Sequence, residues 1–373
     1  MERRLLTLLA ETPVHAGGPE SLAAVDLPIQ REAATGLPVI WGQSLKGALR
    51  QAWRDAKLPD EEAIFGSKPP RSAQNGSSEA EARGSAEVDG DIEVGGPLTK
   101  GAISVGDAQL LAFPAATLRQ VFGWVSAPLL LSRLGRKLRL LGTDPGTAFT
   151  VTLSGGYGLG APGWEGPQVI GPFRENIRTD PRASSIGALL AGLVCPEHDA
   201  FGFTRAKMSD DVLLVDDTTI APLARMGTDV VARVQLNENI KTVAHGPFYS
   251  EHLPAETVLA ALLAGPAEHL EQLARLLDGQ PLQLGGDETL GKGVLWCRMH
   301  SAASSARLLA ATAVQPAASV AAPAAATAPA IAEPAPAAAE PVPAAATIPP
   351  ERPVPKPGPS RPNPALMPRR KHG

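Results

Sequence analysis

The first part of the chain shows one strand pattern and one helix pattern, separated by a long loop. The leucine-rich run 3–11 ends at a Thr-Pro step and predicts a buried strand that the proline stops. After a loop at 15–38, apolar residues recur at helical spacing and predict a helix with Ser44 as its N-cap. The apolar residues of this helix are Leu45, Ala48, Leu49, Ala52 and Trp53.

The later part of the chain alternates strand and helix patterns. The predicted helices cover 127–141 and 266–278. The predicted strands cover 102–113 (broken at Gly106-Asp107), 230–236 and 242–249 (paired across a turn at 237–239), 282–284 and 294–299, while 257–263 fits either type. The order strand, helix, strand, long insertion, strand, helix, strand predicts an α+β protein. Its core would be a ferredoxin-like (RRM-like) βαββαβ unit with large loop insertions.

We assign residues 1–302 to one domain that carries two insertions. Residues 67–100 are rich in Gly, Ser and Glu and predict a mobile insertion. A second inserted region covers about 142–228, in which the glycine- and proline-rich stretch 155–181 predicts a surface excursion. Residues 303–373 are predicted to be a disordered Ala/Pro-rich tail, because the last 63 residues of the chain hold 16 of its 37 prolines and no aromatic residue.

Composition and charge exclude several classes of protein. No apolar run reaches about 18 residues and the N-terminus lacks a secretory signal, so we expect a cytoplasmic protein with no membrane partner. Cys195 and Cys297 are isolated, which predicts core residues rather than a disulfide or zinc ligands. The net charge is −4, and about −7 without the tail, so binding to a nucleic acid would require a local cluster of basic residues.

Familiar catalytic motifs are absent or lack their structural context. The GxGxxG match at 158–163 is interrupted by proline, which prevents the helix that a dinucleotide site needs. The GxxxxGK match that begins at Gly286 has Gly293 where a phosphate loop needs a hydroxyl, and a strand follows it. A GxSxG elbow and a histidine pair at helical metal spacing are both missing. These patterns argue against dinucleotide, ATP and serine-hydrolase chemistry.

The loop at 15–38 is dense in polar groups. They are His15, Gly17, Gly18, Asp26, Gln30, Arg31 and Glu32. Asp26 lies between apolar neighbours that anchor the loop, which would present its carboxylate as a base or as a ligand of a divalent cation. An aspartate before Leu-Pro also fits a turn-capping residue, so this alternative stays open.

The run HAGGPESLAAVDLPIQREAATGLPVIWGQSLKGALR, from His15 to Arg50, resembles the N-terminal signature of the repeat-associated mysterious protein (RAMP) superfamily. It is most similar to the repeated backbone subunit of the Cmr-type (type III-B) CRISPR effector complex. Further similarity lies at 64–66, 103–114, 241–243, 248–249 and 285–293. Trp41 and Gln43 stand where the family commonly has Pro and Ser, which puts the start of the helix in doubt but not the resemblance.

The resemblance implies a subunit that polymerises along a CRISPR RNA together with the other Cmr subunits. It also implies cleavage of the paired target RNA at regular intervals, by attack of the neighbouring 2′-hydroxyl and with a 2′,3′-cyclic phosphate as product. In that family the aspartate matched by Asp26 is required for metal-dependent cleavage, and the histidine matched by His15 lies near the cut. One aspartate is too few ligands for a tight site, so the expected cofactor is a divalent metal, Mg²⁺, bound weakly without RNA.

Contacts to RNA are expected from the helix after the loop and from the glycine-rich turn. Lys46 and Arg50 lie one turn apart on a basic helix face, which fits phosphate binding as well as a merely solvated face. Backbone N–H groups of the turn, at Gly286 and Gly291, and the exposed Lys292 are the other expected phosphate contacts. Tyr249 fits either stacking on a base or ribose, or a place in the core.

Two other functions remain open at the level of sequence. One is a backbone subunit that binds RNA but has lost cleavage. The other is a metal-independent nuclease that processes CRISPR RNA with His15 as general base.

Overall fold

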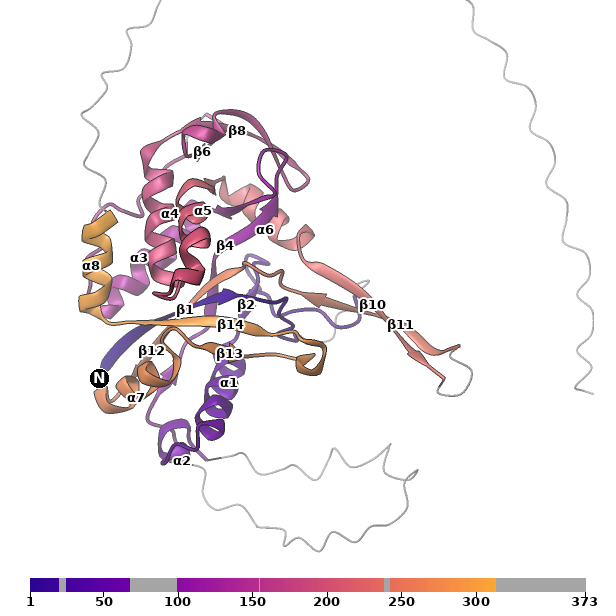
Figure 1. The fold of residues 1–373 in the computed structure, drawn as a ribbon, viewed down its shortest axis with the longest axis vertical. Coiled ribbons are helices and arrows are strands. Elements are labelled where there is room, and N and C mark those ends of the chain that lie inside the picture. Colours follow the sequence, from indigo (N-terminus) through magenta and orange to yellow (C-terminus); the bar gives the residue numbers. More distant parts are fainter. Residues whose placement is uncertain (20–24, 68–98, 154, 238–241, 313–373) are drawn as a thin grey trace, which may run out of the picture. The chain divides into compact units, whose positions relative to one another are not determined.

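The computed structural model describes residues 1–19, 25–67, 99–153, 155–237 and 242–312. Its centre is formed by four strands and two helices (Figure 1). They are β1 (Glu2–Ala10), α1 (Gly42–Asp55), β4 (Ala108–Ala116), β12 (Val258–Gly265), α7 (Ala267–Leu277) and β14 (Val294–His300). The strands lie in the order β14-β1-β12-β4, each antiparallel to its neighbour. This is the order of a ferredoxin-like βαββαβ sheet, so the predicted fold class is confirmed.

Strand β1 lacks a clean polar–apolar alternation because both of its faces are buried. Leu6 and Leu8 pack into one hydrophobic cluster with residues of α1 and α7. Leu5 and Leu9 point the other way, into a second cluster formed with residues of α3 (Pro128–Leu141) and α4 (Pro181–Val194). A strand covered on both faces reads as a continuous apolar run, which is the pattern seen at 3–11. The segment 257–263, which fitted strand or helix, is strand β12 for the same reason.

The same sheet continues beyond β4 with residues 122–228, so the inserted region starts earlier than the predicted bound of about 142. Its strands, in spatial order, are β5 (Phe122–Ser126), β9 (Val212–Leu214), β6 (Tyr157–Gly160), β8 (Phe173–Thr179) and β7 (Gly166–Ile170). Helices α3, α4, α5 (Gly202–Asp210) and α6 (Asp217–Met226) connect them. The prediction of a surface excursion at 155–181 is therefore wrong, because three strands form there. Glycine in β6 allows close approach of neighbouring strands rather than a turn: a Cβ on Gly158 would lie 2.7 Å from the Leu214 carbonyl oxygen.

We expect Gly158→Ala to destabilise the protein by about 1–3 kcal/mol, the usual cost of forcing an extra carbon into a packed region. Gly47→Ala is the matched control, since Gly47 lies in α1 and an added Cβ there would meet nothing within 4 Å. That change should stabilise the protein by about 0.5–1 kcal/mol through helix propensity. Denaturant unfolding measures the free energy of unfolding of both variants. If both changed it by the same small amount, close packing at Gly158 would not be what requires glycine there.

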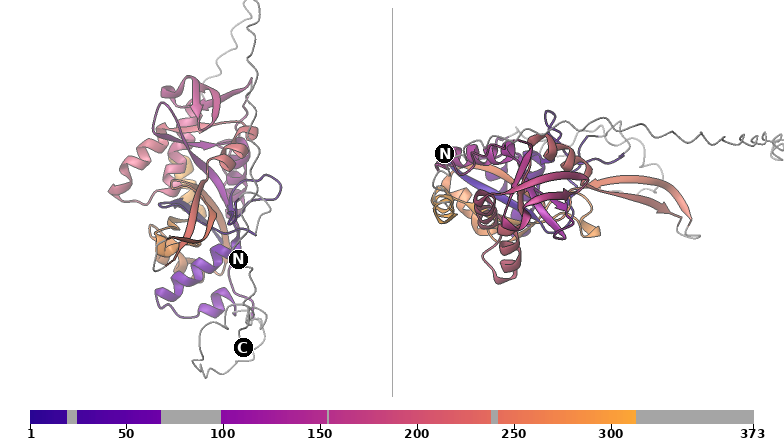
Figure 2. Two further views of the ribbon diagram at one scale, coloured as in Figure 1. Left: turned by 90° about the vertical axis from the view of Figure 1, so that its right-hand side faces the viewer. Right: turned by 90° about the horizontal axis from the view of Figure 1, so that it is seen from above.

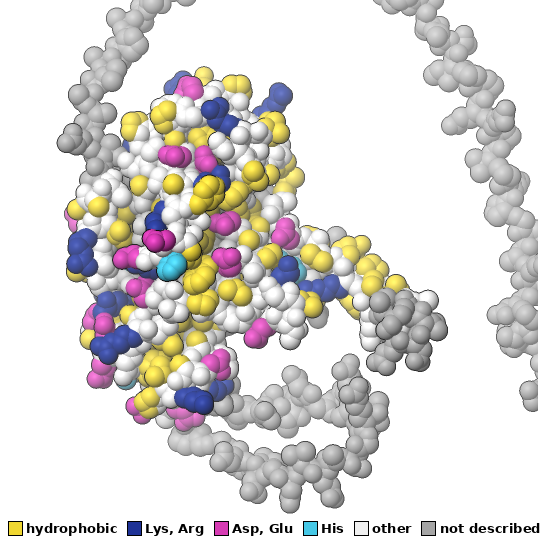
Figure 3. All heavy atoms as spheres, in the orientation of Figure 1, with side chains coloured by type: hydrophobic (Ala, Val, Ile, Leu, Met, Phe, Trp, Pro, Cys, Tyr) yellow, Lys and Arg dark blue, Asp and Glu magenta, His cyan; other side chains and the backbone are white. Residues whose placement is uncertain are grey.

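A separate two-stranded hairpin follows the inserted region. It consists of β10 (Asp229–Leu236) and β11 (Val243–His252), and it extends away from the large sheet in Figures 1 and 2. Several of its apolar side chains are exposed, and the hairpin carries a band of hydrophobic atoms in Figure 3. They are Val230, Val231, Val234, Val243, Phe248 and Tyr249, each at least 40% exposed. A two-stranded ribbon has no core of its own to cover them.

Short elements complete the fold. They are β2 (Val39–Ile40), α2 (Glu61–Phe65), β3 (Ser104–Val105), β13 (Pro281–Gln283), α8 (Ala302–Thr312) and single 3₁₀ turns at Pro162–Trp164, Asp199–Phe201 and Glu288–Leu290. The tail was predicted to begin at 303, but α8 occupies 302–312, where Leu308 and Leu309 pack against the second hydrophobic cluster. Most of 67–100, the turn at 238–239 and the rest of the tail lie outside the described residues.

The two cysteines and the length of the helices bear on the predictions made from composition. Cys195 and Cys297 are free and buried in the hydrophobic clusters, as expected, and burial raises the pKa of Cys195 to about 11. Across the ranges that the structure describes, each helix is too short or too polar to cross a membrane.

Candidate functional site

The polar loop after β1 is held as a narrow ribbon whose two sides hydrogen-bond to each other. The Gly18 N–H donates to the Pro28 carbonyl (2.8 Å) and the Gln30 N–H to the Ala16 carbonyl (2.8 Å). The buried Gln30 side chain then fixes the ribbon to α1: its Nε2 donates to Ser44 Oγ (2.8 Å) and its Oε1 accepts from the Trp41 N–H (2.6 Å). Ser44 was predicted to be the N-cap of this helix, but α1 begins at Gly42, so Ser44 lies inside it and Trp41 is the N-cap.

Asp26 is exposed on the described part of this ribbon. Its Oδ2 accepts a hydrogen bond of 2.8 Å from the backbone N–H of Tyr249 in β11. The Leu27 N–H donates in turn to the Tyr249 carbonyl at 3.0 Å, so the ribbon runs beside the hairpin strand. The carboxylate is therefore both accessible and fixed in position, which a floating loop residue would not be.

His15 lies half-buried near the start of the ribbon, and among the described residues only one of its ring nitrogens has a hydrogen-bond partner. Its Nδ1 lies 2.7 Å from the Glu251 carbonyl oxygen. A carbonyl only accepts, so Nδ1 carries the proton and, in the neutral ring, Nε2 keeps its lone pair. A Cβ on Gly17 would lie 3.3 Å from that Nε2, so glycine at 17 keeps its surroundings open. The Nε2 atom of His15 is suited to accept a proton.

Glu251 is a buried carboxylate that the sequence analysis missed. It accepts hydrogen bonds from Arg31 Nη2 (2.5 Å), Thr228 Oγ1 (2.7 Å) and the Ile29 N–H (3.1 Å). Burial raises the pKa of Glu251, but these hydrogen bonds outweigh it and leave the pKa below its usual value. Glu251 thereby ties the ribbon to the base of the hairpin. Its only signal in the sequence is a charged residue at the end of a strand, just before Leu253-Pro254.

A second missed group lies on the glycine-rich turn. Asp287 accepts hydrogen bonds from Arg233 of β10, with Nη1 at 2.6 Å, and from His252 Nε2 of β11 at 3.0 Å. The Arg233 hydrogen bonds lower the pKa of Asp287 to about 2. The His252 side chain is 1% exposed, and its ring centre lies 5.4 Å from that of His15. In the sequence this turn stands out by its glycines and Lys292, and Asp287 carries no signal of its role.

The glycine-rich turn does not offer the phosphate-binding N–H groups that were predicted. The Gly286 N–H donates to the His15 carbonyl (2.9 Å) and the Gly291 N–H to the Glu288 carbonyl (2.9 Å). The glycines instead permit close packing, since a Cβ on Gly285 would lie 2.4 Å from the His15 carbonyl oxygen. Lys292 is half-buried rather than exposed.

The two basic residues predicted on the face of α1 differ in their contacts. Arg50 donates to Glu61 (2.6 Å) and to the Gly66 carbonyl (2.7 Å), so its guanidinium is already engaged within the protein. Lys46 is half-buried, and no ion pair joins it to another residue in the described ranges. Tyr249 is 40% exposed, which fits a stacking role better than a place in the core.

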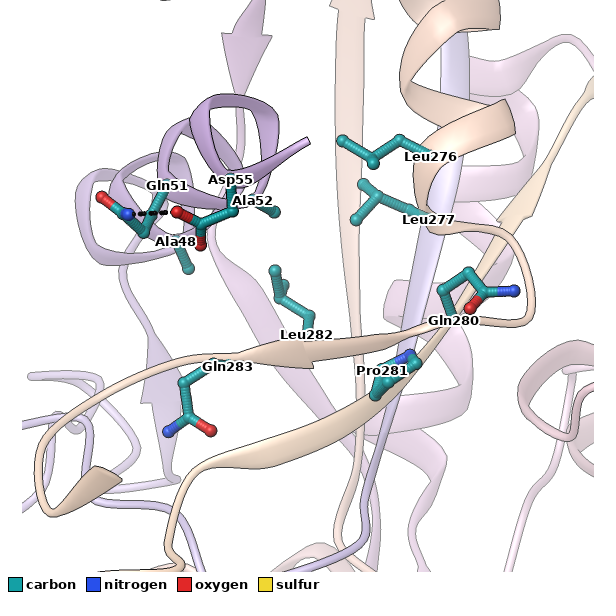
Figure 4. A pocket seen from close by; sticks show the side chains of 10 residues that line it. All are labelled: Ala48, Gln51, Ala52, Asp55, Leu276, Leu277, Gln280, Pro281, Leu282 and Gln283. Atoms are coloured by element: carbon teal, nitrogen blue, oxygen red, sulfur yellow. Dashed lines mark hydrogen bonds between the residues drawn. The ribbon is translucent and has the colours of Figure 1, made fainter. Parts of the chain in front are cut away.

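Cavities on the surface lie beside this site rather than in it. One groove of about 360 Å³ runs between α1, the end of α7 and β13, and its lining mixes Ala and Leu with Gln, Asp and Pro (Figure 4). Its extension, of about 390 Å³, passes Gly47 and reaches Gly285 and Glu288 on the turn. A larger cavity of about 900 Å³ lies between the segment 142–148, α4 and α8, lined partly by the ion pair of Asp180 and Arg182.

The donor set fits only a loosely held metal ion. Among the residues that the structure describes, no three His, Cys, Asp or Glu side chains come together at one point. Asp26 is an exposed oxygen donor of the kind that Mg²⁺ accepts, and this ion commonly keeps several waters and takes further oxygens from substrate phosphates.

Comparison with known proteins gives the class to which this fold and ribbon belong. The sequence profile of the RAMP superfamily matches residues 7–296. The Cmr endoribonuclease Cmr4 of Pyrococcus furiosus is 32% identical over 311 residues, which cover 79% of this chain and 94% of the relative. The crystal structure of oligomeric Cmr4 from the same organism aligns with a TM-score of 0.56 at 24% identity, over 81% of this chain and 99% of that one.

A cryo-EM structure of the type III-B Cmr-beta complex bound to cognate target RNA shares the fold. It aligns with a TM-score of 0.59 at 18% identity, over 80% of this chain and 97% of that one. The chain belongs to the RAMP superfamily. Within it, the chain is a relative of the Cmr4 backbone subunit of the type III-B CRISPR complex.

Proposed function

We propose that this chain is an endoribonuclease backbone subunit of a type III-B CRISPR ribonucleoprotein, which binds CRISPR RNA and cleaves the complementary target RNA. Its relationship to a Cmr endoribonuclease over most of both chains supports this assignment. The observation that carries the chemistry is the placement of Asp26: exposed, and fixed by the Tyr249 N–H beside the hairpin. Copies of this chain and the other subunits of the complex are the proposed protein partners, in the cytoplasm.

The proposed reaction uses the RNA's own 2′-hydroxyl as nucleophile. In-line attack on the adjacent phosphorus breaks the bond to the 5′-oxygen, which takes a proton from water and leaves as a 5′-hydroxyl, while the other fragment ends in a 2′,3′-cyclic phosphate. His15 Nε2 is the group suited to remove the 2′-hydroxyl proton, since its Nδ1 is held by the Glu251 carbonyl. Mg²⁺ held between Asp26 and RNA phosphates would supply stabilisation of the charge that develops on the phosphate.

The hairpin gives this reaction a means to distort the RNA. In-line geometry requires a nucleotide to leave the regular duplex stack, and exposed apolar and aromatic side chains stabilise unstacked bases. Phe248 and Tyr249 are 47% and 40% exposed and lie next to the backbone that holds Asp26. Lys46 is the favoured phosphate contact. Arg50 and Lys292 rank lower, because Arg50 is already engaged within the protein and Lys292 is half-buried. Recognition of the guide would be independent of sequence, because base pairing selects the target.

The test is a reconstituted complex with guide RNA and end-labelled target RNA. We expect target fragments at regular spacing with Mg²⁺, and none in excess chelator. Cleavage of guide precursor in excess chelator would instead favour the metal-independent processing nuclease. A complex that binds target but never cuts it would indicate a purely structural backbone subunit.

A further inference from the structure

We propose that Asp287 is a positioning residue for cleavage, which acts through His252 to orient the imidazole of His15. This inference rests on the proposed function and adds a residue to which neither the sequence pattern nor that function gives a role. Asp287 has a left-handed backbone (φ +66°), and its side chain is only 16% exposed. Its carboxylate is therefore directed into the protein rather than toward RNA.

Asp287 joins the glycine-rich turn to both strands of the hairpin. Both of its carboxylate oxygens accept from Arg233 on β10, and Oδ2 also accepts from His252 Nε2 on β11. The hairpin base is thus clamped to the glycine-rich turn. The same turn pairs with the ribbon, because the Gly286 N–H donates to the carbonyl of His15 itself.

The clamp fixes His252, and His252 lies against His15. An ionised carboxylate only accepts, so His252 Nε2 carries a proton and the orientation of its ring is set by Asp287. Arg233 Nη2 lies 3.5 Å from the same nitrogen, but both groups are donors in this arrangement, so the shared acceptor Asp287 is what holds them together. The two imidazole rings lie 5.4 Å apart with an angle of 54° between their planes. The Glu251 carbonyl at Nδ1 and the His252 ring beside it together set the position of the His15 ring.

The chemistry predicts an effect on the cleavage step and not on RNA affinity. Asp287 touches neither the open nitrogen of His15 nor Asp26. Loss of its charge would release His252 and Arg233 and let the His15 ring leave its reactive orientation. Misplacement of a reacting group by about 1 Å costs on the order of 100-fold in rate.

The experiment compares Asp287→Asn with Glu288→Gln in the assembled complex with guide RNA. Glu288 is the matched control, since it is exposed on the same turn and its loss removes the same charge. We expect Asp287→Asn to lower single-turnover cleavage at saturating target by about 10- to 100-fold, with target affinity unchanged. Glu288→Gln should change neither quantity. In a His15→Ala background, Asp287→Asn should cost nothing further.

His252→Phe is the second variant, because it keeps a ring beside His15 but loses the bond to Asp287. It should reproduce the loss in cleavage rate with normal assembly. Wild-type rates in Asp287→Asn and His252→Phe would overturn the inference, as would a loss caused by weaker target binding or one fully additive with His15→Ala. Failure of the wild-type complex to cut any target would instead overturn the proposed function, so the two failures are distinguishable.

Discussion

Asp26→Asn should abolish target cleavage while the complex still assembles on its guide RNA. An asparagine oxygen can accept the hydrogen bond that the Tyr249 N–H donates to Asp26, so the ribbon should keep its geometry. The charge that would attract a metal ion to the RNA phosphates is lost. We expect the cleavage rate to fall by at least about 100-fold, the lower end of the cost of removing one group that stabilises charge in the transition state. Gel analysis of end-labelled target at saturating concentration measures the rate.

The control for this change is Asp144→Asn, which removes another exposed carboxylate far along the sequence. The Asp144 side chain is 78% exposed, lies 3.5 Å from Arg139 and accepts a hydrogen bond of 3.2 Å from the Gly146 N–H, which an asparagine oxygen can accept as well. Its loss should leave cutting and assembly unchanged. If Asp26→Asn also cut at the wild-type rate, Asp26 would have no part in the mechanism.

Glu251→Gln is expected to produce the largest loss of stability among the variants considered. The substitution leaves the Arg31 guanidinium, 19% exposed, without its carboxylate. Removing one partner of a buried ion pair costs about 3–5 kcal/mol, and we expect the lower end because Arg31 also donates to the carbonyls of Gly36 and Ala224. Glu271→Gln is the control: this carboxylate is 49% exposed in its pair with Arg4, so its loss should cost less than about 1 kcal/mol. Denaturant unfolding measures both.

The stability difference between wild type and Glu251→Gln should depend on pH in one direction. The pKa of Glu251 lies below its usual value in the folded protein, so the folded state favours the ionised form. Its contribution is fully present above the unfolded pKa of about 4.3 and disappears as the pH falls through the lower folded pKa. Unfolding at pH 7, 5 and 3 should show an equal difference at the first two values and a smaller one at the third. A difference that grows at pH 3 would contradict this assignment.

Most of the core could be predicted from sequence because its elements have a distinct local pattern, whereas 257–263 fitted either strand or helix and is identified as strand β12 only by its pairing in the sheet. The apolar runs of β1 and β12 and the helical spacing of α1 and α7 come in the order that the ferredoxin-like sheet requires. The inserted strands could not be predicted in the same way. In β6 the glycines of Tyr157–Gly160 serve contacts with Ile177 and Leu214, which are distant in sequence.

The candidate site shows the same limit. Asp26 and His15 stand out because the loop concentrates polar residues near an apolar anchor, and the structure brings both beside β11. Glu251 and Asp287 could not be found from local pattern, since their partners are 220 and 54 residues away. A backbone N–H carries no sequence signal of its own, so the occupied N–H groups of the glycine-rich turn could only be seen in three dimensions.

Strand β4 has a consequence for any attempt to shorten this protein. Its first half pairs with β2 and β12 of the central sheet, while its second half, from Phe113 to Ala116, pairs with β5 of the inserted region. One continuous strand thus serves as a seam between the two halves of the sheet. Excision of the inserted region would leave the backbone N–H and C=O groups of the second half of β4 without their partner strand, next to the core. Minimised versions of this nuclease therefore need a replacement strand along that seam, not simply a shorter linker.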